Sequence, residues 1–248
     1  MKINLQLNGM NSRIYFVADV HLEKDDLKKK DLFLAFVKMV KGSGGDLYVL
    51  GDLFDYWANN RRVMQDNQAV FDALSGLNRN GSKVGFLIGN RDLLLGEKML
   101  SRYGIDFLGE SKRIVLQGKS LLLTHGHLLY TNDVEFQNYR KTKWPIYRAL
   151  DAFLPGFIEN ALAERFILKS KQVISAKESW RLQFSEETIK ENFTQGIEAI
   201  ICGHSHHTVI KRYDGNKYFI VLPCWDEGRG GYLSMENGDF QIKDFPED

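Results

Sequence analysis

The chain has 248 residues, 44% of them hydrophobic and 26% charged, which is enough for one large domain, or one domain with an insertion, around a full core. The formal net charge of +1 excludes a strongly basic surface overall, so we expect no nucleic-acid partner. The two cysteines exclude a disulfide framework and indicate free thiols in a reducing compartment.

The first half of the chain alternates short apolar runs with amphipathic segments. After residues 1–11, which could form an added edge strand or a loose arm, strands are predicted at 13–18, 47–50 and 84–88, and helices at 31–40 and 63–77. Strands that alternate with helices form a mostly parallel sheet, with the loops after the strands meeting at one edge. Polar residues in those loops can therefore converge although they lie far apart in sequence.

The second half has a different pattern. Residues 113–116 and 120–123 read as a hairpin, residues 197–201 as a strand, and Asp214-Gly215 and Asn237-Gly238 as turns of further hairpins. Between these parts, residues 133–193 are helical in pattern. We interpret residues 133–193 as a helical cap inserted into a catalytic domain that comprises residues 1–132 and 194–248.

All six histidines lie in three short loops, each of which follows an apolar run. Two further loops, which begin at Gly51 and Gly89, carry carboxylate and amide side chains. Together these loops supply seven candidate metal ligands, Asp19, His21, Asp52, Asn90, His125, His204 and His206. A single Asp-x-His or Gly-Asp sequence is commonly just an ordinary turn. Closely spaced histidines are more specific, because they are costly to bury without a ligand. Nitrogen and oxygen ligands without thiolate suit Mn²⁺, Fe or Zn²⁺, and two such ions about 3.5–4 Å apart can activate water for phosphoryl transfer.

The order of these motifs resembles that of the calcineurin-like metallophosphoesterases. The resemblance implies a four-layer α/β/β/α sandwich and a site for two divalent metal ions, with Mn²⁺ the expected metal. By this resemblance the first ion would be held by Asp19, His21, Asp52 and His206, and the second by Asp52, Asn90, His125 and His204. Asn90, Arg91 and His125 are the candidate catalytic residues.

Arg91 stands where many members of that superfamily have a histidine, a plausible proton donor to the leaving group. Arginine stays protonated and cannot donate that proton, but it can bind phosphate oxygens in a bidentate manner. A site without the donor works best on a leaving group that is a weak base, and this favours a diphosphate substrate. The alternative is that Arg91 only pairs with Asp92 or Asp55.

A closer resemblance, to the UDP-2,3-diacylglucosamine hydrolase family, agrees with this interpretation. It rests on residues 51–57, 89–96, 131–140 and 221–225. It implies that the diphosphate of a UDP-linked diacylglucosamine lipid is split to UMP and 2,3-diacylglucosamine 1-phosphate. The sequence departs from the family pattern at His127, Asn132, Phe136 and His207, and the metal ligands are unaffected. The alternatives are a soluble nucleotide pyrophosphatase or phosphodiesterase and, from another class, a metal-stabilised scaffold with a vestigial site.

Such a substrate needs an apolar groove for its acyl chains. The apolar stripe over residues 150–166 could supply the groove, or it could simply pack against the core. The candidate substrate-binding residues are Asn90, Arg91, Asp133, Arg140, Lys171, Lys177 and His204, with Lys169 near them. No apolar run is long enough to span a bilayer, and the first residues lack the apolar core of a signal peptide. We therefore expect a cytoplasmic protein with transient peripheral contact at the inner membrane surface.

Overall fold

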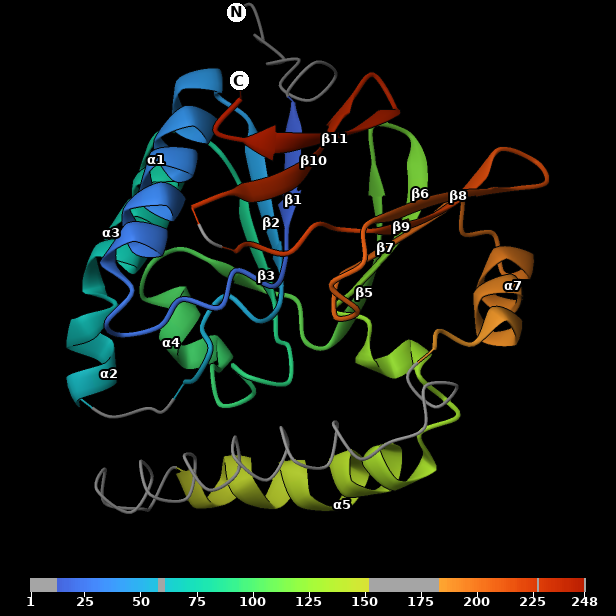
Figure 1. Ribbon diagram of the computed structural model, residues 1–248, viewed down its shortest axis with the longest axis horizontal. Coiled ribbons are helices and arrows are strands. Elements are labelled where there is room, and N and C mark those ends of the chain that lie inside the picture. Colours follow the sequence, from blue (N-terminus) through green and yellow to red (C-terminus); the bar gives the residue numbers. More distant parts are fainter. Residues whose placement is uncertain (1–12, 58–60, 152–182, 227, 248) are drawn as a thin grey trace, which may run out of the picture.

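The computed structural model describes residues 13–57, 61–151, 183–226 and 228–247, and it contains two β-sheets packed face to face (Figure 1). The first sheet has six strands in the order β11-β10-β1-β2-β3-β4. Its parallel strands are β1 (Ile14–Val17), β2 (Asp46–Leu50), β3 (Val84–Leu87) and β4 (Asp106–Phe107). The antiparallel strands β10 (Gly230–Glu236) and β11 (Asp239–Phe245) complete it at the β1 side.

The second sheet has five strands in the order β5-β6-β7-β9-β8. They are β5 (Ser111–Leu116), β6 (Lys119–Thr124), β7 (Ala199–Cys202), β9 (Lys217–Val221) and β8 (Val209–Tyr213). The predicted hairpins are confirmed, since β5 pairs with β6, β8 with β9, and β10 with β11, all antiparallel. β6 and β7 are parallel neighbours, so the loops that follow them lie at the same end of this sheet.

Helices cover the outer faces of both sheets and confirm the four-layer α/β/β/α arrangement (Figure 1). α1 (Leu27–Ser43) and α3 (Gln68–Arg79) pack on the first sheet, and α7 (Glu186–Thr194) packs on the second. The shorter helices are α2 (Arg61–Asp66), α4 (Glu97–Ser101) and the 3₁₀ helix η1 (His127–Leu129), and α5 (Val134–Asp151) begins the predicted cap. Among the helices described, none is both long and apolar enough to cross a membrane.

The alternation of side chains along β1 shows how the layers are built. Ile14 and Phe16 point into the core between the two sheets, whereas Tyr15 and Val17 point toward α1 and α3. All four are buried, because both faces of a mostly parallel sheet are covered. The core thus fixes the strands whose ends carry the site.

The prediction of one continuous helix over residues 63–77 is wrong, because this segment forms two helices, α2 and α3, which are separated at Asn67. The Lys30 side chain of α1 donates a hydrogen bond to the Asp66 carbonyl at 2.9 Å, and the Asn67 amide donates to the Val63 carbonyl at 3.0 Å. These side chains take carbonyl groups that a continuous helix would use itself. The other predicted elements are found with shifted ends. α1, for example, starts earlier than predicted because Asp26 caps it.

Most of the predicted apolar stripe over residues 150–166, and residues 1–11 with their predicted edge strand or arm, lie outside the described residues. The division into a catalytic domain and an inserted cap stays a prediction. α5 does begin, as expected, directly after Asp133.

Candidate metal centre

The seven predicted metal ligands come from five loops that meet at one edge of the two sheets. Each loop follows a strand: β1, β2 and β3 in the first sheet, and β6 and β7 in the second. Parallel neighbours within each sheet bring the carboxyl ends of these strands together. The convergence predicted from the sequence is therefore confirmed by the topology.

The backbone at this edge is strained. Five of the predicted ligands have positive φ angles, namely Asp19 (52°), His21 (50°), Asp52 (53°), His204 (76°) and His206 (57°). Residues with a Cβ rarely adopt this left-handed region, and such strain clusters at functional sites because the surroundings hold it in place. Small residues allow the loops to approach. A Cβ at Gly89 would collide with the Asp52 carboxylate, and one at Gly203 with that of Asp19.

One group of ligands gathers around the Asp19 carboxylate. The Nε2 atoms of His21 and His206 lie 3.8 Å and 3.7 Å from Asp19 Oδ1. The two nitrogens face each other at 3.2 Å. Asp19, His21 and His206 can thus place three ligand atoms around one ion.

A second group gathers around Nε2 of His125. This nitrogen lies 3.1 Å from Asn90 Oδ1, 3.4 Å from Asp52 Oδ2 and 3.2 Å from Nδ1 of His204. It also lies 4.0 Å from Asp19 Oδ1, so Asp19 contacts both groups. The assignment of Asp52 as the ligand shared by two ions stays a prediction.

Divalent metal ions fit these residues. Asp19 is fully buried, and its Oδ1 has no hydrogen-bond partner among the described residues, although its Oδ2 accepts from the His204 backbone N–H at 2.7 Å. An uncompensated buried carboxylate is strongly unfavourable, and a cation among nitrogen and oxygen donors removes the penalty.

The pKa values of His125 and Asp52 also indicate that this site favours positive charge. Burial alone would lower the pKa of His125, but the neighbouring Asp52 carboxylate outweighs it and raises the pKa to about 9. Although burial opposes the charged form of Asp52, His125 in turn holds the pKa of that carboxyl well below its usual range. The pKa of His204 is well below its ordinary value because the ring is buried beside His125. The carboxylates of Asp52 and Asp19 thus favour the positively charged form of His125.

Arg91 lies beside this centre. Its backbone N–H donates to Asp52 Oδ1 at 2.9 Å, and its buried Nη1 has no partner among the described residues. The alternative pairing with Asp92 is not formed, since the Asp92 carboxylate accepts from the backbone N–H groups of Leu53 at 2.9 Å and Gly89 at 2.6 Å. Asp92 thereby ties the β2 and β3 loops together and leaves the Arg91 guanidinium available for an anion.

The cap residues predicted to bind substrate have protein partners of their own. Asp133 Oδ1 accepts from the Phe136 backbone N–H at 3.1 Å and so caps the start of α5. The Arg140 guanidinium pairs with the Glu110 carboxylate at 2.5 Å and donates to Gln137 Oε1 at 3.3 Å. Lys169, Lys171 and Lys177 lie outside the described residues. The substrate contacts of all these residues stay predictions.

The two histidines outside the ligand set differ in environment. His127 is fully buried, burial lowers its pKa to about 4, and its ring packs against Trp144 of α5 at 5.3 Å. His207 is exposed. Glu110 and Tyr130, which also lie close to the ligand loops, were not predicted, because neither belongs to a motif.

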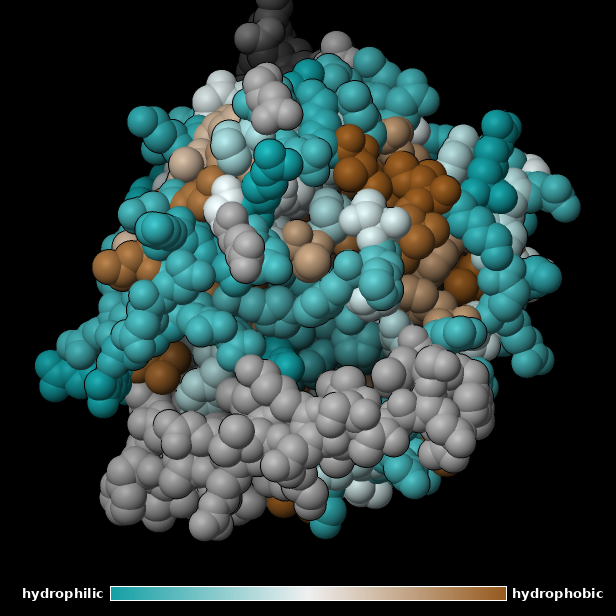
Figure 2. Space-filling model, viewed as in Figure 1, coloured by the Kyte–Doolittle hydropathy of each residue, from teal (hydrophilic) through white to brown (hydrophobic). Residues whose placement is uncertain are grey.

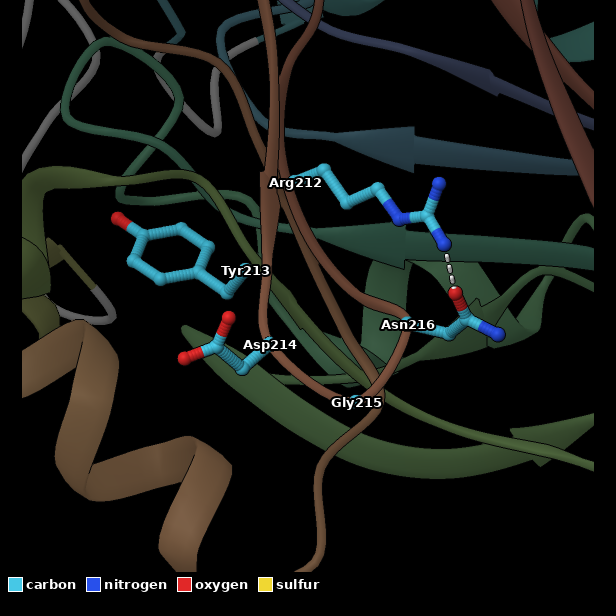
Figure 3. Close-up of a pocket in the computed structure, with 5 residues that line it drawn as sticks. All are labelled: Arg212, Tyr213, Asp214, Gly215 and Asn216. Atoms are coloured by element: carbon cyan, nitrogen blue, oxygen red, sulfur yellow. Dashed lines mark hydrogen bonds between the residues drawn. The ribbon is translucent and has the colours of Figure 1, made fainter.

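A concave surface elsewhere does not belong to the centre. It lies at the tip of the β8–β9 hairpin, where Arg212 donates to Asn216 while Tyr213 and Asp214 point to the other side (Figure 3). None of the predicted site residues lines it. It is the outer surface of a two-strand turn.

Comparison with known proteins agrees with this geometry. The profile of the calcineurin-like phosphoesterase family matches residues 12–208. The chain belongs to this family. Membership makes the protein a metal-dependent hydrolase, with divalent metal ions as its cofactors.

Two curated relatives cover almost the whole chain. A UDP-2,3-diacylglucosamine hydrolase of Haemophilus influenzae (strain PittGG) is 32% identical over 236 residues, which are 93% of this chain and 98% of that protein. A protein of the same name from Stenotrophomonas maltophilia (strain R551-3) is 34% identical over 240 residues, 89% of this chain and 94% of that protein. The recognition made from the sequence motifs is confirmed.

Replacing Asn90 or His125 with alanine is expected to abolish Mn²⁺-dependent turnover and leave the fold intact, because each removes one ligand and no core side chain. Turnover with added Mn²⁺ and the circular dichroism spectrum measure the two effects. Retained turnover in a folded variant would contradict the ligand assignment.

Metal binding is expected to release a proton and to strengthen as pH rises. His125 is protonated below its pKa of about 9 and has to lose that proton before Nε2 can bind an ion. Below that pH the affinity should fall by up to about tenfold per pH unit. Calorimetric titration with Mn²⁺ in buffers of different ionisation enthalpy measures the released protons, and an enthalpy independent of the buffer would contradict the prediction.

Proposed function

We propose that the protein hydrolyses the diphosphate bond of UDP-2,3-diacylglucosamine and releases UMP and 2,3-diacylglucosamine 1-phosphate. The relatives named for this reaction cover 93% and 89% of the chain, which supports the substrate. The observation that carries the proposal is the Nη1 of Arg91, which lies beside the candidate metal centre and has no hydrogen-bond partner among the described residues. A guanidinium there suits a diphosphate, because such a leaving group needs no proton.

We further propose a centre for two ions, most consistent with Mn²⁺. Asp19, His21, Asp52 and His206 would hold one ion, and Asp52, Asn90, His125 and His204 the other. When bound, the ions would activate water and neutralise charge on the phosphoryl group. The two clusters of ligand atoms around Asp19 and His125 support this assignment.

The residues of the chain would divide the remaining work. The Arg91 guanidinium would bind phosphate oxygens and stay charged at every accessible pH. Because Asn90 turns its Oδ1 toward His125, its amide nitrogen would face the substrate side and donate to a phosphate oxygen. Asp133 and Arg140 would contact the glucosamine, with Lys171 and Lys177 meeting phosphate or an anionic surface.

The lipid substrate also indicates where the enzyme works. Two acyl chains keep the substrate in a membrane, so we propose peripheral contact with the cytoplasmic face of the inner membrane. The face in Figure 2 is largely hydrophilic around the described part of the site, with apolar residues gathered over the second sheet. A net charge of +1 supports the expectation of no nucleic-acid partner.

The substrate is tested by comparing UMP release from UDP-2,3-diacylglucosamine and from UDP-N-acetylglucosamine, each with Mn²⁺. The diacyl substrate should react at least about a hundredfold faster, since burial of only four methylene groups is worth about 3 kcal/mol. Equal rates would contradict a lipid substrate and favour a soluble nucleotide pyrophosphatase.

Arg91→His is expected to move the ratio of activities toward simple phosphomonoesters, because histidine can protonate an alkoxide leaving group. Turnover of a phosphomonoester and of the diphosphate substrate is measured on both proteins, with Arg91→Gln as the control that also removes the guanidinium but supplies no acidic proton. An unchanged ratio in Arg91→His, or an equal change in Arg91→Gln, would contradict the proposed leaving group.

A further inference from the structure

The two histidines of the second ligand group are held in different ways. The His125 ring is fixed by a hydrogen bond, since its Nδ1 lies 2.9 Å from the Leu50 carbonyl oxygen and its Nε2 faces the centre. Metal-binding histidines usually have such a partner on the second nitrogen. For His204, Nδ1 faces the centre, and no hydrogen bond to Nε2 is found among the described residues. Something else has to orient its ring.

The Tyr130 ring is placed to do so. It meets the His204 ring edge to face, with ring centroids 4.9 Å apart and planes at 75°. This is a favourable aromatic geometry. Tyr130 is only 5% exposed. The same ring lies on the loop that follows β6, next to the loop that carries His204. Tyr130 thus supports the ring of His204, whose own backbone has a positive φ angle.

Tyr130 has firm support on its other side. Its ring packs on Phe184 at 4.7 Å, and Phe184 packs on Phe219 of β9 at 5.0 Å. The neighbouring Leu129 carbonyl accepts from the Ser185 backbone N–H at 2.8 Å. These contacts join Tyr130 to the outer core of the second sheet, so the ring is anchored independently of the metal centre.

The two loops are also fastened to each other. The Gly203 backbone N–H donates to the His125 carbonyl at 2.9 Å. At Gly126 the loops approach so closely that a Cβ would lie 2.9 Å from the Gly203 carbonyl oxygen and 3.0 Å from Cβ of His204. The loop that leads to Tyr130 and the loop that carries His204 are therefore held in a fixed relation.

We propose that Tyr130 is a positioning residue for the metal centre: its ring fixes the orientation of His204 and so sets the affinity for the second ion. The inference rests on the proposed centre for two ions. Ring packing by Tyr130 would orient His204, just as the hydrogen bond to the Leu50 carbonyl orients His125.

The test is Mn²⁺ binding by the full chain, measured by competition with a chelator and by electron paramagnetic resonance of the bound ions. Tyr130→Leu should lower the affinity for the second ion by about tenfold or more, which is the usual effect of losing an outer partner of a metal ligand. The affinity for the first ion should be unchanged. Tyr130→Phe keeps the ring and should bind the second ion within about threefold of the parent, since the edge-to-face contact with His204 remains. Phe193→Leu removes a ring of the same outer core that packs on Tyr213 and lies outside the chain of rings supporting Tyr130, so it should lower Tm and leave both affinities unchanged.

The inference is overturned if Tyr130→Leu binds both ions like the parent, if Tyr130→Phe loses as much affinity as Tyr130→Leu, or if Phe193→Leu lowers the affinity for the second ion as much as Tyr130→Leu does. Failure of the underlying centre looks different, because the unmutated chain would then bind fewer than two ions.

Discussion

The arrangement of the candidate metal centre depends on the buried carboxylate of Asp19. Its Oδ1 faces nitrogens of His21, His125 and His206 at 3.7–4.0 Å and accepts no hydrogen bond from the described residues. A negative charge in that position is unfavourable without a cation nearby. The fold nevertheless packs a core on both sides of the strand that delivers Asp19. The packing of the sheets therefore offsets the free-energy cost of burying this charge, and a bound cation would lower that cost.

The strained backbone belongs to the same constraint. Positive φ angles at Asp19, Asp52 and His204 turn their side chains toward one point, and each such residue costs about 1–3 kcal/mol. The Asp92 carboxylate links two of these loops, and the bond from Gly203 to the His125 carbonyl links two others. Because the loops hold one another, the ligands are arranged before an ion arrives, and binding spends little energy on ordering them.

Much of the fold and the metal site could be predicted because the information is local. A buried strand is a short apolar run, and a ligand in the loop after it needs only its own position in that pattern. The break at Asn67 could not be predicted, since it depends on Lys30 of another helix. Tyr130 could not be predicted for a related reason, since an isolated tyrosine belongs to no motif. Its contact with His204 joins residues that are brought together only by the pairing of β6 with β7.

The inner face of α5 connects the predicted cap to this centre. Gln137 donates to the His127 carbonyl at 2.8 Å, Arg140 pairs with Glu110, and Trp144 packs on the His127 ring, all within one helical stripe. The two arginines at the site consequently differ. The Nη1 of Arg91 has no partner in the described part of the chain, whereas any anion that reaches Arg140 has to share its guanidinium with Glu110. A phosphate would thus bind first and most strongly at Arg91, and a neutral hydroxyl or amide suits the Arg140 side better.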